Sequence, residues 1–247
     1  MTKKIRLSKI SVMHYIKLVL RSVLFVIATL IYVLNRIFET GESFGGLQSN
    51  PWVLGIIWLI FVAEMVLRFF PSKLESMGCQ KQFKKNYIEI PHEEKKVSVH
   101  PWIVTFAVAA AWIALNAVIG VLYFTNVIDR GILLLICLAY SVCDVICILF
   151  FCPFQIWFMK NKCCATCRIY NWDYAMMFTP LIYIPNIYAW SLLGVALLLL
   201  LKWEINYRRH PERFCEKTNR SLSCAMCTEK LCHQKRQLIE FRKKIRK

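Results

Sequence analysis

Apolar residues in this chain are gathered into long runs that are separated by short charged segments. An α-helix needs roughly 20 consecutive apolar residues to cross a bilayer. Four runs reach about that length, over residues 13–34, 51–70, 101–124 and 132–151. Prolines stand at their edges: Pro51 and Pro101 occupy first-turn positions, and Pro71 and Pro153 follow the ends. The pattern therefore predicts four membrane-spanning helices.

A fifth apolar stretch, residues 170–203, is too long for one straight span and short for two spans with a turn. Pro180 and Pro185 interrupt it. Because proline breaks a helix, we expect a short or re-entrant helix up to about residue 184 and a final span over 187–201. Two complete spans, or one long tilted span, are the alternatives.

Irregular backbone within a bilayer must be covered by protein or line a cavity, because its polar groups find no water there. The broken stretch is therefore a candidate binding region. Its candidate site residues are Asn171, Asp173, Pro180 and Pro185.

The composition supports this division into apolar and basic parts. The chain is 57% hydrophobic, yet its formal net charge is +17. A nucleic-acid-binding protein would interleave its basic residues with polar ones, so we expect no nucleic-acid partner. Cytoplasmic loops of membrane proteins carry an excess of Lys and Arg, and such residues also contact anionic lipids of the inner leaflet.

Lys and Arg are unevenly distributed between the loops. They are frequent before the first run, in 72–100, in 152–173 and in the tail 204–247, whereas the opposite loops hold Arg36 and Arg130. The positive-inside rule then predicts a multi-pass plasma-membrane protein with both termini in the cytoplasm.

The predicted fold is an all-α, polytopic transmembrane bundle of about 5–6 membrane segments, one of them broken or re-entrant. Its parts are a four-span region, a cysteine-rich cytoplasmic loop, a broken membrane hairpin and a basic, cysteine-rich tail. These parts cover residues 1–151, 152–173, 174–203 and 204–247.

Twelve cysteines are present, and eight of them form two quartets. Each quartet contains a C-x-x-C step, a spacing that lets two thiolates bind one metal ion. The candidate ligands are Cys152, Cys163, Cys164 and Cys167 in the loop, and Cys215, Cys224, Cys227 and Cys232 in the tail. We expect Cys137, Cys143 and Cys147, within the fourth run, to be packing residues.

The spacing leaves the cofactor open between an iron–sulfur cluster and zinc, because neither quartet matches a ferredoxin run or a zinc ribbon. Thiol–disulfide exchange or palmitoylation without a metal is the third reading. An iron–sulfur cluster beside the membrane border would pass electrons to a lipophilic carrier or a membrane redox partner.

Several charged residues fall inside the predicted spans, where ionised groups normally pair or line a polar cavity. They are Lys17, Arg21, Glu64, Arg68 and Asp144, and we expect the long side chain of Lys17 to reach the membrane border. Counting about 1.5 Å per residue places Arg21, Glu64 and Asp144 at a similar depth. We expect either a salt-bridge network that fixes helix packing or a proton or cation pathway.

The leading functional hypothesis is a membrane redox protein with cysteine-bound metal centres. The alternatives are a small transporter or channel with structural zinc, and an interaction scaffold on the inner leaflet. The chain has no phosphate-binding loop, H-E-x-x-H or G-x-S-x-G motif, which argues against a nucleotide-driven pump and a hydrolase. Whether it is an enzyme stays open.

Overall fold

The computed structural model describes residues 9–38, 51–71, 80–90, 102–159, 163 and 166–227. All regular elements of this described part are helical, which confirms the predicted all-α class. The longer helices are α1 (Lys9–Ile37), α2 (Pro51–Leu67), α4 (Trp102–Phe124), α5 (Arg130–Leu149), α6 (Asp173–Phe178) and α7 (Ile187–Arg209). Short turns of helix are η2 (Lys84–Asn86), η3 (Phe154–Phe158), η5 (Tyr170–Trp172), η6 (Thr179–Tyr183), η7 (Pro211–Phe214), η8 (Arg220–Leu222) and η9 (Cys224–Met226).

Four helices, α1, α4, α5 and α7, are long and apolar enough to cross a membrane. Helix α2 is shorter, at 17 residues. Helix α7 continues to Arg209, beyond residue 201, where the predicted membrane span ends. The apolar run stops at Lys202, but no residue breaks the helix before Pro211, whose ring disfavours helical backbone at His210.

Helix α1 buries polar residues and exposes apolar ones. Its buried residues are Ser11, His14 and Arg21, which recur on one face, whereas large apolar side chains such as Leu20 and Leu30 are exposed. A helix of a soluble protein has the opposite distribution. An apolar outer surface with an inward polar face is expected where the surroundings are lipid.

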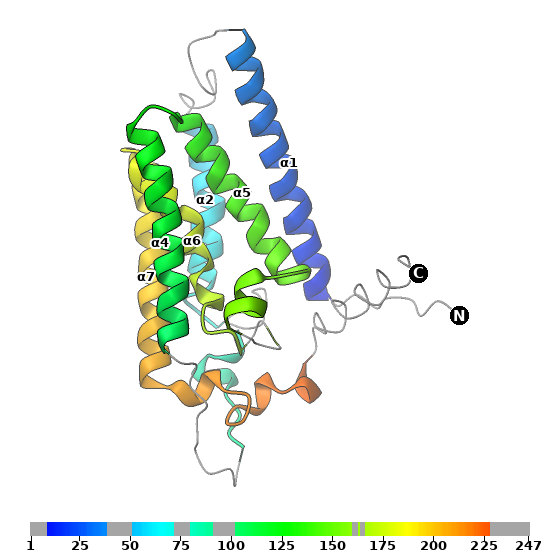
Figure 1. The fold of residues 1–247 in the computed structure, drawn as a ribbon. Coiled ribbons are helices and arrows are strands. Elements are labelled where there is room, and N and C mark those ends of the chain that lie inside the picture. The colour runs from blue at the N-terminus through cyan, green and yellow to red at the C-terminus, as the bar shows by residue number, and fades with distance from the viewer. Residues whose placement is uncertain are drawn as a thin grey trace, which may run out of the picture.

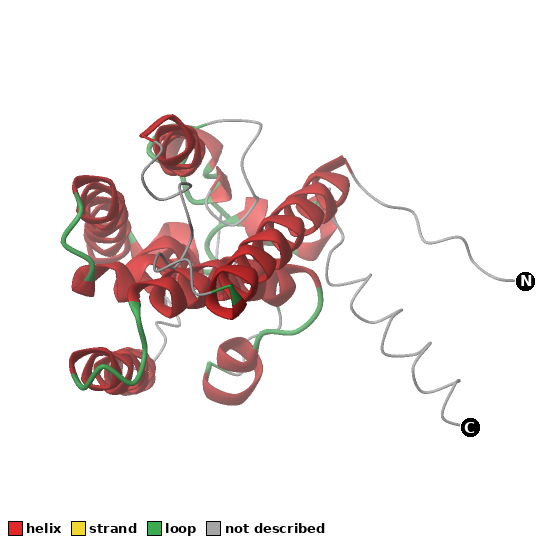
Figure 2. Cartoon of the chain, turned by 90° about the horizontal axis from the view of Figure 1, so that it is seen from above, coloured by secondary structure: helices red, strands yellow, loops and turns green. Residues whose placement is uncertain are grey.

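The broken stretch forms the centre of the bundle. Its two pieces, α6 and η6, contact α5 and α7, and η6 also contacts α4 (Figure 1). Helix α6 ends at Phe178, one residue before the turn that contains Pro180, and α7 begins after Pro185 with Asn186 as its N-cap. Seen from above, the long helices do not form a single layer (Figure 2). This is the interrupted arrangement expected from the two prolines.

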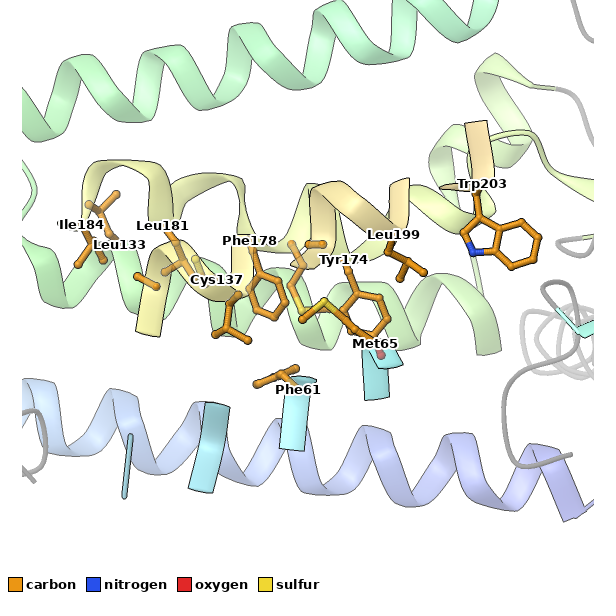
Figure 3. Close-up of a cluster of buried hydrophobic side chains, with 14 residues drawn as sticks. Phe61, Met65, Leu133, Cys137, Tyr174, Phe178, Leu181, Ile184, Leu199 and Trp203 are labelled. Atoms are coloured by element: carbon orange, nitrogen blue, oxygen red, sulfur yellow. The ribbon is translucent and has the colours of Figure 1, made fainter. Parts of the chain in front are cut away.

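The main hydrophobic core is built on this central segment. Tyr174, Phe178, Leu181 and Ile184 are all buried in it, with Phe61 of α2 and other side chains around them (Figure 3). Polar contacts hold the segment in place, since Trp112 Nε1 donates to Thr179 Oγ1 at 3.2 Å. The broken backbone is therefore covered by protein on several sides, as irregular backbone within a bilayer requires.

Three described loop segments gather at one end of the bundle, together with the N-terminal end of α1 (Figure 1). We call the described residues within 80–90, 150–172 and 210–227 the loop end. Asn219 joins two of these segments, because its Nδ2 donates to Lys81 O at 3.1 Å and to Arg213 O at 2.8 Å. Because the chain returns to this end after α7, the stretch from α6 to α7 forms a hairpin.

We predict that Gly120 is required for the contact between α4 and η6. A Cβ atom at Gly120 would lie 2.5 Å from the ring of Tyr183, whereas no described atom lies within 4 Å of a Cβ atom at Gly194. Gly120→Ala should lower the free energy of unfolding by about 1–3 kcal/mol through overpacking. Gly194→Ala should leave it unchanged or raise it by up to about 1 kcal/mol, because alanine favours helix. Titration with SDS in mild detergent measures both, and equal effects would contradict the prediction.

Candidate functional site

A buried ion-pair network connects α1, α2 and α5 at mid-bundle. Arg21 of α1 lies at its centre: Nη2 donates to Glu64 Oε2 at 2.8 Å, and Nη1 donates to Asp144 Oδ2 at 3.2 Å. Lys17, expected at the membrane border, joins the network instead, with its Nζ 3.3 Å from Glu64 Oε1. The hydroxyl of Tyr174, on α6, also donates to Glu64 Oε2 at 2.8 Å. The structure thus brings together three of the four charged residues predicted to meet.

The fourth predicted residue, Arg68, pairs with Asp173 at the start of α6. Arg68 Nη1 lies 2.6 Å from Asp173 Oδ2, and the two side chains are only 4% and 8% exposed. The guanidinium of Arg68 also lies over the ring of Tyr174, 4.5 Å from its centroid. The sequence had suggested Asp173 as a polar ligand in the broken stretch but gave no signal of its pairing with Arg68.

Among the residues that the structure describes, the charges of this network balance. Its cations belong to Lys17, Arg21 and Arg68, and its anions to Glu64, Asp144 and Asp173. Buried ion pairs are costly to form, and removing one partner leaves an uncompensated charge. The balance favours a network that holds the helices together and gives the adjacent space no net charge.

A cavity of about 300 Å³ adjoins this network. Its walls come from α4, α5, α6 and the loop end. Aromatic rings form much of the surface, and the two carboxylates Asp144 and Asp173 lie in its wall. The aromatic residues are Trp112, Tyr140, Phe154 and Tyr170. The broken stretch contributes Asp173 and also Met176 and Met177. A mainly apolar hollow with a few polar groups is typical of a small-molecule site.

Four thiols also line the cavity, those of Cys143, Cys147, Cys152 and Cys167. Cys152 and Cys167 belong to the first predicted quartet, whereas Cys143 and Cys147 were predicted to be packing residues. Cys137 does pack in the core. The sequence did carry a signal for this. Cys147 and Ile148 follow Asp144 by three and four residues, so all three share one face of the helix.

The remaining predicted metal ligands lie at the loop end or outside the described residues. Cys163, Cys215, Cys224 and Cys227 are at the loop end, while Cys164 and Cys232 lie outside the described residues. Among the residues that the structure describes, no three His, Cys, Asp or Glu side chains form a group that could hold a metal ion. The iron–sulfur and zinc assignments therefore stay predictions.

An ion pair between Arg168 and Glu204 attaches part of the cavity wall to α7. Arg168 stands between Cys167 and Ile169, which line the cavity. The guanidinium of Arg168 makes two hydrogen bonds to the Glu204 carboxylate, and Trp172 Nε1 donates to Glu204 Oε1 at 2.8 Å. Arg168 also stacks over Tyr207, 3.6 Å from the ring centroid. Sequence reasoning missed this anchor, because it ended the last helix before Glu204.

The other candidates of the broken stretch are not among the residues that line the cavity. Asn171 is buried, and its Nδ2 donates to Gln82 Oε1 at 3.0 Å, which ties the stretch to residues 80–90. Pro180 is buried in the centre of the bundle, and Pro185 is exposed before α7. Of the four residues proposed for this stretch, Asp173 lines the cavity.

Comparison with known proteins gives no relative from which a function follows. No protein family, curated protein or solved structure matches the chain. The interpretation of the site therefore depends on its geometry.

We predict that Arg21 stabilises the bundle by neutralising Glu64 and Asp144. Arg21→Met should lower the free energy of unfolding by about 3–5 kcal/mol, the usual cost of breaking a buried ion pair from one side. Adding Glu64→Gln and Asp144→Asn to that variant should recover much of the loss. SDS titration measures each step, with Arg130→Met, an exposed site, as the control. A triple variant no more stable than Arg21→Met would contradict this role.

Proposed function

We propose that this chain is an integral membrane protein that binds one small, neutral, mainly apolar molecule in the cavity between α4, α5 and α6. It belongs functionally with transporters and other proteins that handle lipophilic molecules within the bilayer. The observation that carries the proposal is the position of the cavity, because the interrupted segment supplies part of its wall. Interrupted helices at membrane depth commonly form substrate sites.

The charge balance supports a neutral ligand. Asp144 and Asp173 already face Arg21 and Arg68, so a bound ion would add a charge with no counter-charge in the network. An uncompensated charge in an apolar interior costs several kcal/mol. A hydroxyl or amine hydrogen on a neutral molecule can instead donate to a carboxylate oxygen that lines the cavity.

The size and the aromatic wall support a molecule with a ring. A volume of about 300 Å³ suits a ligand of one or two fused rings. Trp112 and Tyr140 lie with ring centroids 4.7 Å apart, and Phe154 lies 6.3 Å from Trp112. Rings arranged in this way favour offset or edge contacts with an aromatic guest.

The location proposed for this function is the plasma membrane, with the loop end and both termini in the cytoplasm. The basic loops support this orientation through the positive-inside rule and through attraction to anionic inner-leaflet lipids. The cavity then lies in the cytoplasmic half of the bilayer, next to the segment that carries Cys152 and Cys167.

The test uses 1-naphthol, a neutral two-ring molecule with one hydroxyl group. We expect saturable binding of one molecule per chain in lipid nanodiscs, measured by equilibrium dialysis against empty nanodiscs. Met176→Trp should weaken binding at least about tenfold by filling the cavity, since tenfold corresponds to only about 1.4 kcal/mol. Naphthalene, which has no donor, should also bind about tenfold more weakly, because a hydrogen bond to a carboxylate contributes about 1.5–3 kcal/mol.

The matched control is Ile146→Trp, which places the same side chain on an exposed face of α5. It should bind 1-naphthol like the unmodified protein. If binding does not saturate above that of empty nanodiscs, or if Met176→Trp leaves it unchanged, the proposed function is wrong.

The iron–sulfur hypothesis is the second candidate, favoured by the closeness of the thiols to the membrane segment. Metal analysis and a visible spectrum of protein purified without oxygen separate the two. Iron with acid-labile sulfide and broad absorption near roughly 400 nm would support electron transfer through a cluster. A colourless protein with zinc or without metal is the result expected if the cavity carries the function.

A further inference from the structure

One oxygen of Asp173 is buried without a hydrogen-bond partner. Its Oδ2 lies 2.6 Å from Arg68 Nη1, but Oδ1 receives no hydrogen bond from the residues that the structure describes. A buried acceptor that lacks a donor lowers stability, and the cost is larger for a charged group. Asp173 also lines the cavity. A molecule bound there therefore lies against a carboxylate that lacks one donor.

The unpartnered oxygen distinguishes Asp173 from the rest of the cavity wall. Of the described residues that line the cavity, Asp173 alone has a buried side-chain oxygen or nitrogen without a hydrogen bond. Oδ2 of Asp144, the other carboxylate, accepts a hydrogen bond from Arg21 Nη1, and the Asp144 side chain is 16% exposed, against 8% for Asp173. Water therefore reaches Asp144 more readily, and the need for a donor from a bound molecule is greater at Asp173.

The position of Asp173 on α6 indicates where the rest of the ligand lies. Met176 and Met177 follow it by three and four residues, and both also line the cavity. Residues at this spacing share one face of a helix, with Cβ atoms roughly 5–6 Å apart. A methionine sulfur packs well against the edge of an aromatic ring. A ligand whose donor reaches Asp173 then has its ring one helical turn further along, so the donor group belongs directly on the ring.

We propose that Asp173 selects the ligand of the cavity, and that this ligand is a neutral aromatic molecule whose ring carries an O–H or N–H group. Phenols and indoles are of this kind. The inference rests on the proposed function, because it names the ligand class of the same cavity. The ligand donates its hydrogen bond to Oδ1 of Asp173, while Oδ2 keeps its contact with Arg68. The ring packs between the methionines of α6 and the aromatic side chains of Trp112, Tyr140 and Phe154.

The assignment also states what the cavity excludes. An ether, a ketone or an N-methylated indole has a similar size but no donor, and it leaves Oδ1 of Asp173 unpaired at a position shielded from water. A site built around a hydrogen bond to its ligand rejects analogues that lack the bonding group more strongly than analogues that differ only in size. Asp173 therefore controls the preference for a donor, and packing sets the affinity that all ligands of this shape share.

The experiment measures this preference in lipid nanodiscs by equilibrium dialysis, with two pairs of probes. We expect 1-naphthol to bind at least about tenfold more tightly than 1-methoxynaphthalene, and indole at least about tenfold more tightly than 1-methylindole, because a hydrogen bond to a charged group supplies that factor. Arg68→Met with Asp173→Leu removes the ion pair as a unit and leaves the remaining charges of the described network balanced. This variant should lower both preferences to about twofold or less.

The matched control is Arg21→Met with Asp144→Leu, which removes the other carboxylate of the cavity wall together with its cation. It should keep both preferences, whatever its effect on the affinity for all four probes. Saturable binding of naphthalene shows that the cavity is intact in each variant. Arg68→Gln with Asp173→Asn keeps both side chains polar and provides a second variant. It should also lower the preferences, because a neutral amide oxygen is a weaker acceptor than a carboxylate.

The outcomes separate the two proposals. If 1-naphthol and naphthalene bind saturably but both Asp173 variants keep the preference for a donor, Asp173 is not the selecting residue and the proposed function stands. Equal loss of preference in the Asp144 control would also overturn the inference, because selection would then depend on the network as a whole. If none of the probes saturates above empty nanodiscs with the unmodified protein, the proposed function itself fails.

Discussion

The structure depends on the pairing of buried charges. In an apolar interior an isolated charge costs several kcal/mol, so Arg21, Glu64 and Asp144 must pair with one another. This pairing requires α1, α2 and α5, which carry the three residues, to lie side by side. Apolar packing alone does not fix these helices, because lipid is as apolar as their outer faces. Helix α1 makes this plain, since its buried face is polar and its exposed face is apolar.

The same constraint positions the central segment. Arg68 of α2 needs a counter-charge, and Asp173 supplies it from the first residue of α6, while Tyr174 donates to Glu64 from the next position. These two residues attach α6 to the network before Pro180 ends the regular backbone. The short helix cannot fill the space that a full span would fill, and the cavity lies beside it, between the network and the loop end.

The sequence predicted the parts that depend on local pattern. Apolar runs located the long helices, and Pro180 and Pro185 located the break, because proline acts on its own neighbourhood. It failed where contacts between distant elements decide. Hydropathy ended the last helix before Glu204, although a helix beyond the bilayer needs no apolar residues. The pairing of Arg68 with Asp173 depends on where α6 lies, which no local signal gives.

The thiols illustrate the limit of spacing as a guide to chemistry. C-x-x-C steps directed attention to Cys164 and Cys167, because two thiolates at that spacing converge easily. Cys147 and Cys152 have no such spacing, yet both line the cavity, because α5 unwinds between them. The unwinding is itself explained by Pro153, which disfavours helical backbone just before it, so that the helix ends a few residues early. The wall of the cavity therefore follows from where that helix stops.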